Sequence, residues 1–95
     1  MRGRMRGFHA AAGRVRPRLL RQAAAMVGPN DAEDVVQEAL VRAWRLTRIR
    51  PKNWESWLFR ITVNTAKNWL RARQMEIPME SVDSILERWN SDGDA

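Results

Sequence analysis

The chain lacks cysteine and tyrosine, has a single histidine, and contains no apolar run long enough to cross a membrane. Without cysteine it forms neither a disulfide nor a thiolate metal site, and His9 alone cannot build a metal site. The basic N-terminus, MRGRMRG, is followed by no apolar signal core, so we expect no secretion signal. These absences predict one small cytoplasmic domain of 95 residues with no cofactor and no membrane partner.

Signals for β-strands are also scarce, whereas alanine, leucine, arginine and glutamate are plentiful. This composition and the apolar spacing predict an all-α fold. We expect four helices, the last of them short, at residues 8–27, 32–46, 54–73 and 81–90.

The expected helix ends follow from capping residues and helix breakers. Asn30 or Asp31 is the predicted N-cap of the second helix, and Asn53 is that of the third. Pro17 lies inside the first helix, where it should bend the helix or restart it. The last residues, 91–95, are expected to be disordered.

The charges follow the chain in four blocks. Residues 1–30 hold seven arginines and no acid, and residues 31–40 hold four acids and no base. Residues 41–75 hold nine bases and one acid, and residues 76–95 hold six acids and one base. The basic blocks favour a polyanion, and the acidic decapeptide favours a cationic partner or a helix N-terminus. The alternative is that these blocks are solvated faces of a helical protein.

Residues 57–73, WLFRITVNTAKNWLRAR, present two faces when they are read at helical spacing. The predicted buried stripe consists of Trp57, Leu58, Ile61, Thr65 and Trp69. The polar side carries cations and amides but no carboxylate: Arg60, Asn64, Asn68 and Arg71, with Lys67 and Arg73 at its margin. Cations suit phosphates, and an asparagine can read a base edge with two hydrogen bonds. We therefore predict a helix that packs on one side and binds nucleic acid on the other.

Three segments resemble, in order, region two of bacterial sigma factors of the extracytoplasmic-function (ECF) group: RPRLLRQAAAMVG, DAEDVVQEALVRAWR and WLFRITVNTAKNWLRARQ. The resemblance implies a compact bundle of three or four helices at residues 1–75, with a basic segment at 1–7. Residues 76–95 then form an acidic tail that resembles the start of the linker between the family's two domains. The alternative is a short helix that covers the core, and the two interpretations are compatible. The region-four domain of the family has no room in this chain, which leaves open a fragment or a natural one-domain relative.

In that family the acidic second helix docks on the clamp helices of the RNA polymerase beta-prime subunit. The resemblance therefore implies that Asp34, Gln37 and Glu38 bind core RNA polymerase, with an apolar contact from Leu40 or Val41. Carboxylates and an amide within one helical turn are also able to pair with arginines of a partner helix. The alternative is an ordinary solvated helix face.

The family's third helix and the loop before it bind the non-template strand of the promoter minus-ten element and hold a flipped base. Asn64 and Asn68 match the contacting positions. Charge and position on the helix add four candidate phosphate contacts: Arg60, Lys67, Arg71 and Arg73.

The loop TRIRPKNWES looks shorter than the family's loop, so the base that it reads stays open. Its DNA-facing candidates are Arg48, Arg50, Lys52 and Asn53. Trp54 either stacks on a base or packs at the start of the third helix. The other tryptophans of this region are expected in the core: Trp44, Trp57 and Trp69.

The leading interpretation is a sigma factor domain that binds core RNA polymerase and melts the minus-ten element of promoter DNA in transcription initiation. Two alternatives stay open: an interaction module bound by an anti-sigma protein, and a generic basic helical DNA-binding domain. The sequence shows no nucleophile–base pair, no metal-ligand cluster and no glycine-rich phosphate loop, so we do not expect an enzyme.

Overall fold

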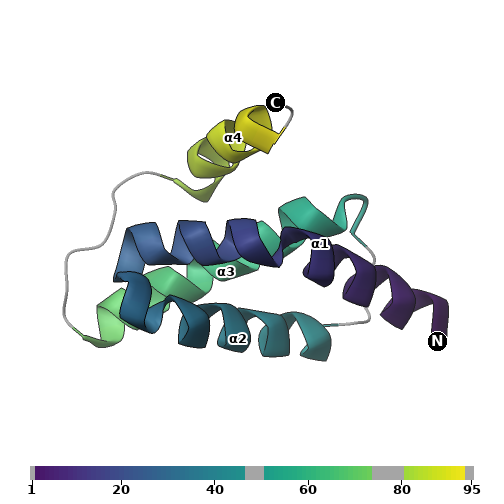
Figure 1. The fold of residues 1–95 in the computed structure, drawn as a ribbon, viewed down its shortest axis with the longest axis horizontal. Helices are drawn as coiled ribbons and strands as arrows, with labels where there is room; N and C mark the ends of the chain where they lie inside the picture. The colour runs from purple at the N-terminus through teal and green to yellow at the C-terminus, as the bar shows by residue number, and fades with distance from the viewer. Residues whose placement is uncertain (1, 47–50, 74–80, 94–95) are drawn as a thin grey trace.

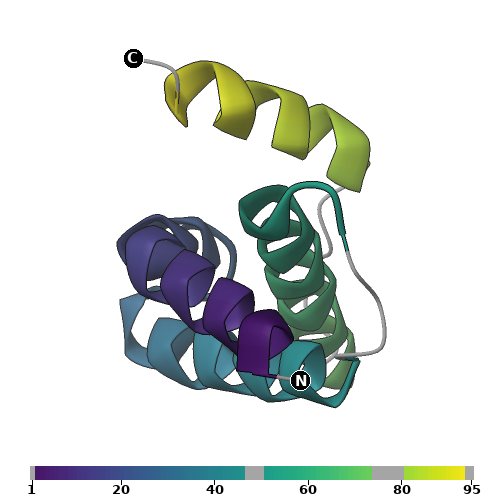
Figure 2. The ribbon, with the colours of Figure 1, turned by 90° about the vertical axis from the view of Figure 1, so that its right-hand side faces the viewer.

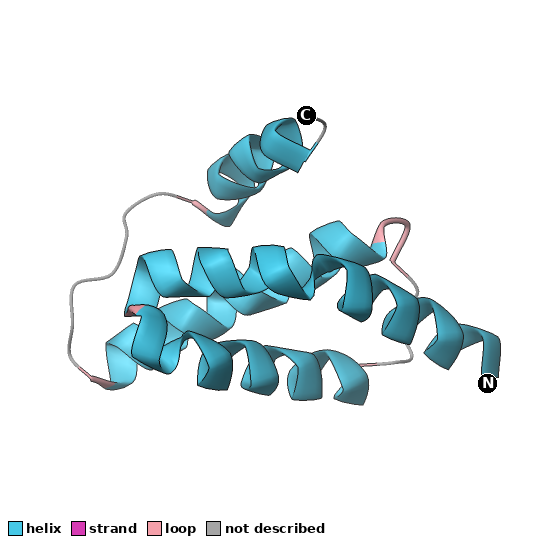
Figure 3. Cartoon of the chain, in the orientation of Figure 1, coloured by secondary structure: helices cyan, strands magenta, loops and turns pink. Residues whose placement is uncertain are grey.

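The computed structural model describes residues 2–46, 51–73 and 81–93, and these ranges contain four helices and no strand. The helices are α1 (Arg2–Val27), α2 (Pro29–Arg45), α3 (Trp54–Ala72) and α4 (Val82–Gly93). The all-α prediction is therefore confirmed (Figure 3). Helices α1, α2 and α3 lie together, and both views show α4 on one side of them (Figures 1 and 2). Within the described ranges, no helix combines the length and hydropathy that crossing a lipid bilayer requires.

Helix α1 is longer than predicted, since it begins at Arg2 and continues through Pro17 to Val27 without a restart. A proline inside a helix removes one backbone donor and favours a bend. In Figure 1, α1 changes direction along its length. The side chain of Pro17 is exposed, so its ring does not disturb the packing of the buried side.

The core lies between α1, α2 and α3, and each helix buries one stripe of apolar residues at a spacing of three and four. The buried residues of α1 are Phe8, Ala11, Val15, Leu19 and Ala23. Those of α2 are Ala32, Val35, Val36, Ala39 and Ala43. Those of α3 are Leu58, Phe59, Val63, Ala66 and Leu70. The many alanines let the helices approach closely around the larger side chains.

The buried face of α3 is rotated slightly from the predicted one. Leu58 and Thr65 are buried as predicted. The three other members of the predicted stripe are only partly buried: Trp57, Ile61 and Trp69. Phe59 and Val63 take the centre of the face and are completely buried. A tryptophan at the edge of a small core keeps part of its large ring exposed, whereas a phenylalanine and a valine fit inside.

Helix α2 begins one residue before Asn30, so the prediction that Asn30 or Asp31 caps it was wrong. The N-cap is Gly28, and no side chain caps this end. Gly28 has φ of 92° and ψ of 157°, a conformation that essentially only glycine adopts. Pro29 takes the first helical position, where its missing N–H would be unpaired in any case. The turn is thus made by the backbone of Gly28 and Pro29, and it needs no polar side chain.

Helix α4 matches the predicted short fourth helix and packs on α3 through Ile85, Leu86 and Trp89. The Trp89 ring lies against the Phe59 ring, with centroids 4.6 Å apart. The helix continues to Gly93, so the prediction of disorder was wrong for residues 91–93, and residues 94–95 lie outside the described ranges. The described part of the acidic tail therefore covers the core.

Gly28, at the N-cap of α2, and Gly13, inside α1, should respond in opposite ways to substitution by alanine. Gly28→Ala should lower the free energy of unfolding by about 1–3 kcal/mol, because alanine is strained at this positive φ. Gly13→Ala should raise it by about 0.5–1 kcal/mol, because Gly13 is helical and exposed, with open space around the added carbon. Urea unfolding followed by circular dichroism measures both changes. Equal effects of the two substitutions would contradict the assignment of Gly28 as the turn residue.

Candidate nucleic-acid and polymerase interfaces

The polar side of α3 faces outward along most of the helix. The predicted DNA-binding residues that are exposed on it are Arg60, Asn64, Asn68 and Arg71, and Lys67 is partly buried. Arg73, directly after α3, is exposed as well. The buried side is polar at only two positions, and both hydroxyls are satisfied within the helix. Thr62 donates to the carbonyl of Leu58 at 2.8 Å, and Thr65 donates to that of Ile61 at 2.7 Å. The structure therefore separates the predicted contact residues from the core.

The side chains of Asn68 and Arg71, both exposed on α3, are joined by a hydrogen bond. Arg71 donates from a guanidinium nitrogen to the side-chain oxygen of Asn68 at 3.0 Å. This hydrogen bond uses one of the two lone pairs of the Asn68 side-chain oxygen and does not involve its NH₂ group. Asn64 lies one turn before Asn68, and its side chain is exposed.

Arg73 is drawn away from this face toward the start of α2. Its guanidinium forms an ion pair with Asp31 at 2.6 Å and lies 4.7 Å from the centre of the Trp69 ring. Stacking on an aromatic ring and pairing with a carboxylate both favour a fixed guanidinium. Arg73 therefore joins the end of α3 to the start of α2, a role that the sequence analysis did not predict.

The loop before α3 is described only from Pro51 onward, so the candidates Arg48 and Arg50 lie outside the described residues. Lys52 is exposed. The side-chain oxygen of Asn53 accepts a hydrogen bond from the Ser56 backbone N–H at 3.0 Å, which confirms Asn53 as the N-cap of α3.

Trp54 packs at the start of α3. Its ring makes edge contacts with Phe8, at 6.1 Å between centroids, and with Trp57, at 5.5 Å. A Cβ added at Gly7 would stand only 3.1 Å from the Trp54 indole nitrogen, so α1 also approaches this ring closely. These contacts favour the packing interpretation of Trp54 over base stacking.

Trp44 is not a core residue, and that prediction was wrong. Its ring contacts Phe8 and His9, with centroids 6.0 and 5.6 Å away, yet the residue is 48% exposed. The nearby Val41 and Leu46 are also exposed. Helix α1 therefore covers the Trp44 ring only in part, through Phe8 and His9.

The outward side of α2 carries the predicted polymerase-binding residues. Asp34, Gln37 and Val41 are exposed, and Glu38 is partly exposed while it pairs with Arg42 at 3.1 Å. Trp44 continues this row by one further helical turn. The spacing of 37, 41 and 44 was a signal in the sequence for this exposed position, and it was missed.

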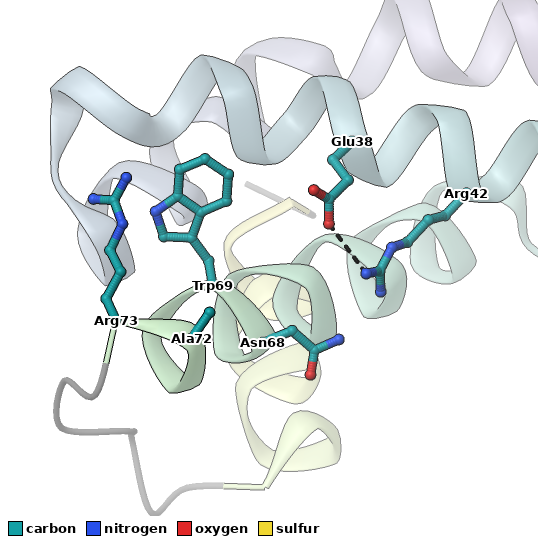
Figure 4. A pocket seen from close by; sticks show the side chains of 6 residues that line it. All are labelled: Glu38, Arg42, Asn68, Trp69, Ala72 and Arg73. Carbon is teal, nitrogen blue, oxygen red and sulfur yellow. Dashed lines mark ion pairs between the residues drawn. The ribbon is translucent and has the colours of Figure 1, made fainter.

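A hollow of about 440 Å³ lies between the two outward faces. Glu38 and Arg42 enter it from α2, and the other lining residues come from the end of α3: Asn68, Trp69, Ala72 and Arg73 (Figure 4). Glu38 of the α2 face and Asn68 of the α3 face therefore border the same hollow.

Residues 12–76 match the family described as Sigma-70 region 2. The chain belongs to this family. The match includes the whole of α2 and α3, which carry both outward faces. It confirms the resemblance to region two of sigma factors.

Similar sequences include ECF RNA polymerase sigma-E factors, in line with the ECF type of this region two domain. The protein of Escherichia coli K12 is 44% identical over 70 residues, which are 70% of this chain and 37% of the relative. That of Salmonella typhimurium LT2 is 43% identical over 70 residues, with the same coverage. That of Haemophilus influenzae is 43% identical over 58 residues, which are 59% of this chain and 31% of the relative. The chain thus spans little more than a third of these sigma-E factors, and no solved structure gives a significant match.

Substitution of two asparagines of this region two domain by alanine should have different effects on stability. Asn53→Ala removes the side-chain cap of α3 and should lower the free energy of unfolding by about 1 kcal/mol. Asn64→Ala lies in the exposed helix interior and should leave stability unchanged or slightly raised. Thermal and urea unfolding measure both, and an equal loss in the two variants would contradict the capping role.

Proposed function

We propose that this chain is a domain of a sigma factor that binds core RNA polymerase and captures the opened minus-ten strand of a promoter in transcription initiation. One observation carries the proposal. A bundle that matches Sigma-70 region 2 presents an acidic and apolar face on α2 and a cationic and amide face on α3, and the two faces meet at one hollow. The domain performs no covalent chemistry, and its mechanism is binding.

The α2 face is the proposed docking site for the clamp helices of the beta-prime subunit. Asp34 and Glu38 offer carboxylates to arginines of a partner helix, and Gln37 adds an amide between them. Val41 and Trp44 supply exposed apolar surface beside these charges. Tryptophans in such positions are frequent hot spots, so Trp44 joins the proposed polymerase contacts.

The α3 face is the proposed site for the non-template strand. Asn64 and Asn68 read base edges, and the neighbouring cations contact phosphates. Because the Asn68 oxygen accepts from Arg71, its NH₂ group is the part that faces a base acceptor. Lys52 and Asn53 lie at the entrance to the same helix and extend the proposed contact toward the loop.

Strand capture explains how a protein without enzymatic chemistry opens a duplex. Flipping a base out of a stack costs a few kcal/mol, and a mismatched or single-stranded base costs least. A ligand shifts an equilibrium only by its different affinities for the two states. A face that binds single-stranded DNA better than the duplex therefore shifts the promoter toward the melted form.

The two faces should be separable by mutation. Gln37→Ala combined with Glu38→Arg should abolish binding of core RNA polymerase, because it removes an amide and reverses a carboxylate on α2. Asn64→Ala should leave polymerase binding unchanged but weaken binding of the opened promoter strand about 5- to 150-fold, since one bidentate base contact contributes about 1–3 kcal/mol. A pull-down of core polymerase and fluorescence anisotropy with labelled single-stranded promoter DNA measure the two activities.

Glu87→Arg is the matched control for the charge reversal, because Glu87 is exposed on α4 and lies outside both faces. It should retain polymerase binding. Loss of both activities in each variant, with the helices still folded, would refute the separation of the faces. Absence of polymerase binding by the wild type, together with duplex binding that falls steeply with salt, would instead support a generic DNA-binding domain.

A further inference from the structure

Helix α4 places a carboxylate on the proposed DNA-binding face. Asp83, in the first turn of α4, forms an ion pair with Arg60 of α3 at 2.5 Å. Both side chains remain accessible to solvent, with 46% of Arg60 and 76% of Asp83 exposed. A phosphate of a bound strand would use the same guanidinium donors as the Asp83 carboxylate.

The position of Asp83 is fixed by contacts elsewhere on α4. Ile85, Leu86 and Trp89 are buried against the bundle, and the Trp89 ring packs on Phe59. Arg18 of α1 makes two contacts with Trp89, near the C-terminal end of α4. Its guanidinium carbon lies 3.8 Å from the centre of the Trp89 ring, and one of its nitrogens donates to the Trp89 carbonyl at 2.5 Å. The carboxylate of Asp83 is therefore held beside Arg60 by packing that does not depend on the ion pair.

We propose that α4 is a built-in competitor of the DNA strand, in which Asp83 occupies Arg60 in place of a phosphate. The proposal rests on the function proposed above, because it requires that α3 bind DNA. A strand that contacts Arg60 has to displace the carboxylate, although α4 itself remains docked through Trp89. Helix α4 thus lowers strand affinity without closing the whole face, since Asn64, one turn further along α3, stays exposed.

The expected size of the effect follows from counterion release. Each phosphate that a protein neutralises on a single strand changes the slope of log K against log salt by about 0.7. Freeing Arg60 for one more phosphate should therefore tighten binding about fivefold near 0.1 M salt. An exposed ion pair is a weak contact that a polyanion is able to replace.

Asp83→Asn in the full chain tests the competition. The probe is a fluorescein-labelled pool of short single-stranded DNA of random sequence, and anisotropy gives its affinity between about 0.05 and 0.3 M salt. The variant should bind about fivefold more tightly than the wild type near 0.1 M salt, with a slope steeper by about 0.7. In the Arg60→Ala background, the same substitution should change neither the affinity nor the slope.

Glu33→Gln is the matched control, because it removes the same charge and breaks another interhelical ion pair, that of Glu33 with Arg16 at 3.4 Å. It should bind like the wild type. Equal gains from Asp83→Asn and Glu33→Gln, or an equal gain from Asp83→Asn with and without Arg60, would overturn the competition and leave only a general charge effect. If Asn64→Ala weakens strand binding while Asp83→Asn changes nothing, the competition fails and the proposed function stands. If the wild type binds no strand, both fail.

Discussion

Burial of one side of α3 is the constraint on which the other features depend. The pairs Leu58–Phe59 and Thr62–Val63 are completely buried between the helices. The residue after each pair is rotated by about another 100° and lies outside this buried arc. This sets the direction of Arg60 and Asn64 independently of any contact that their own side chains make. The same buried side receives α4, because Trp89 packs on Phe59. The core residues of α3 thus orient both the proposed DNA face and the helix that competes for it.

The close packing of α2 beside α3 gives the two outward faces a common border. Asp31 at the start of α2 pairs with Arg73 after the end of α3, and Arg73 also stacks on Trp69. Between these elements lies the hollow that Glu38 and Asn68 share. The proposed polymerase site and the proposed strand site therefore lie side by side. Any coupling between them would pass through this border.

The features that could be predicted from the sequence are those that depend on the spacing of residues within one helix. The helical class, the separation of a buried and a polar side of α3, and the Asn53 cap all follow from residues close together in the chain. The structure contains each of them. The ion pairs of Arg60 and Arg73 are formed with residues of other helices, so no local sequence pattern predicts them. Trp44 was misplaced because it follows Leu40 by four residues and Val41 by three, so helical spacing puts it at the border between the buried and outward sides of α2.

The central claim is that separate faces of one small bundle bind polymerase and the DNA strand. Amide chemical shifts of the isotope-labelled full chain, recorded by nuclear magnetic resonance, test this claim most directly. The chain is titrated once with isolated beta-prime clamp helices and once with single-stranded promoter DNA. The account predicts that the clamp helices shift amides along α2 from Asp34 to Trp44 and that the strand shifts amides along α3 from Arg60 to Arg71. Shifts by both ligands on the same set of residues, or by neither on these helices, would contradict it.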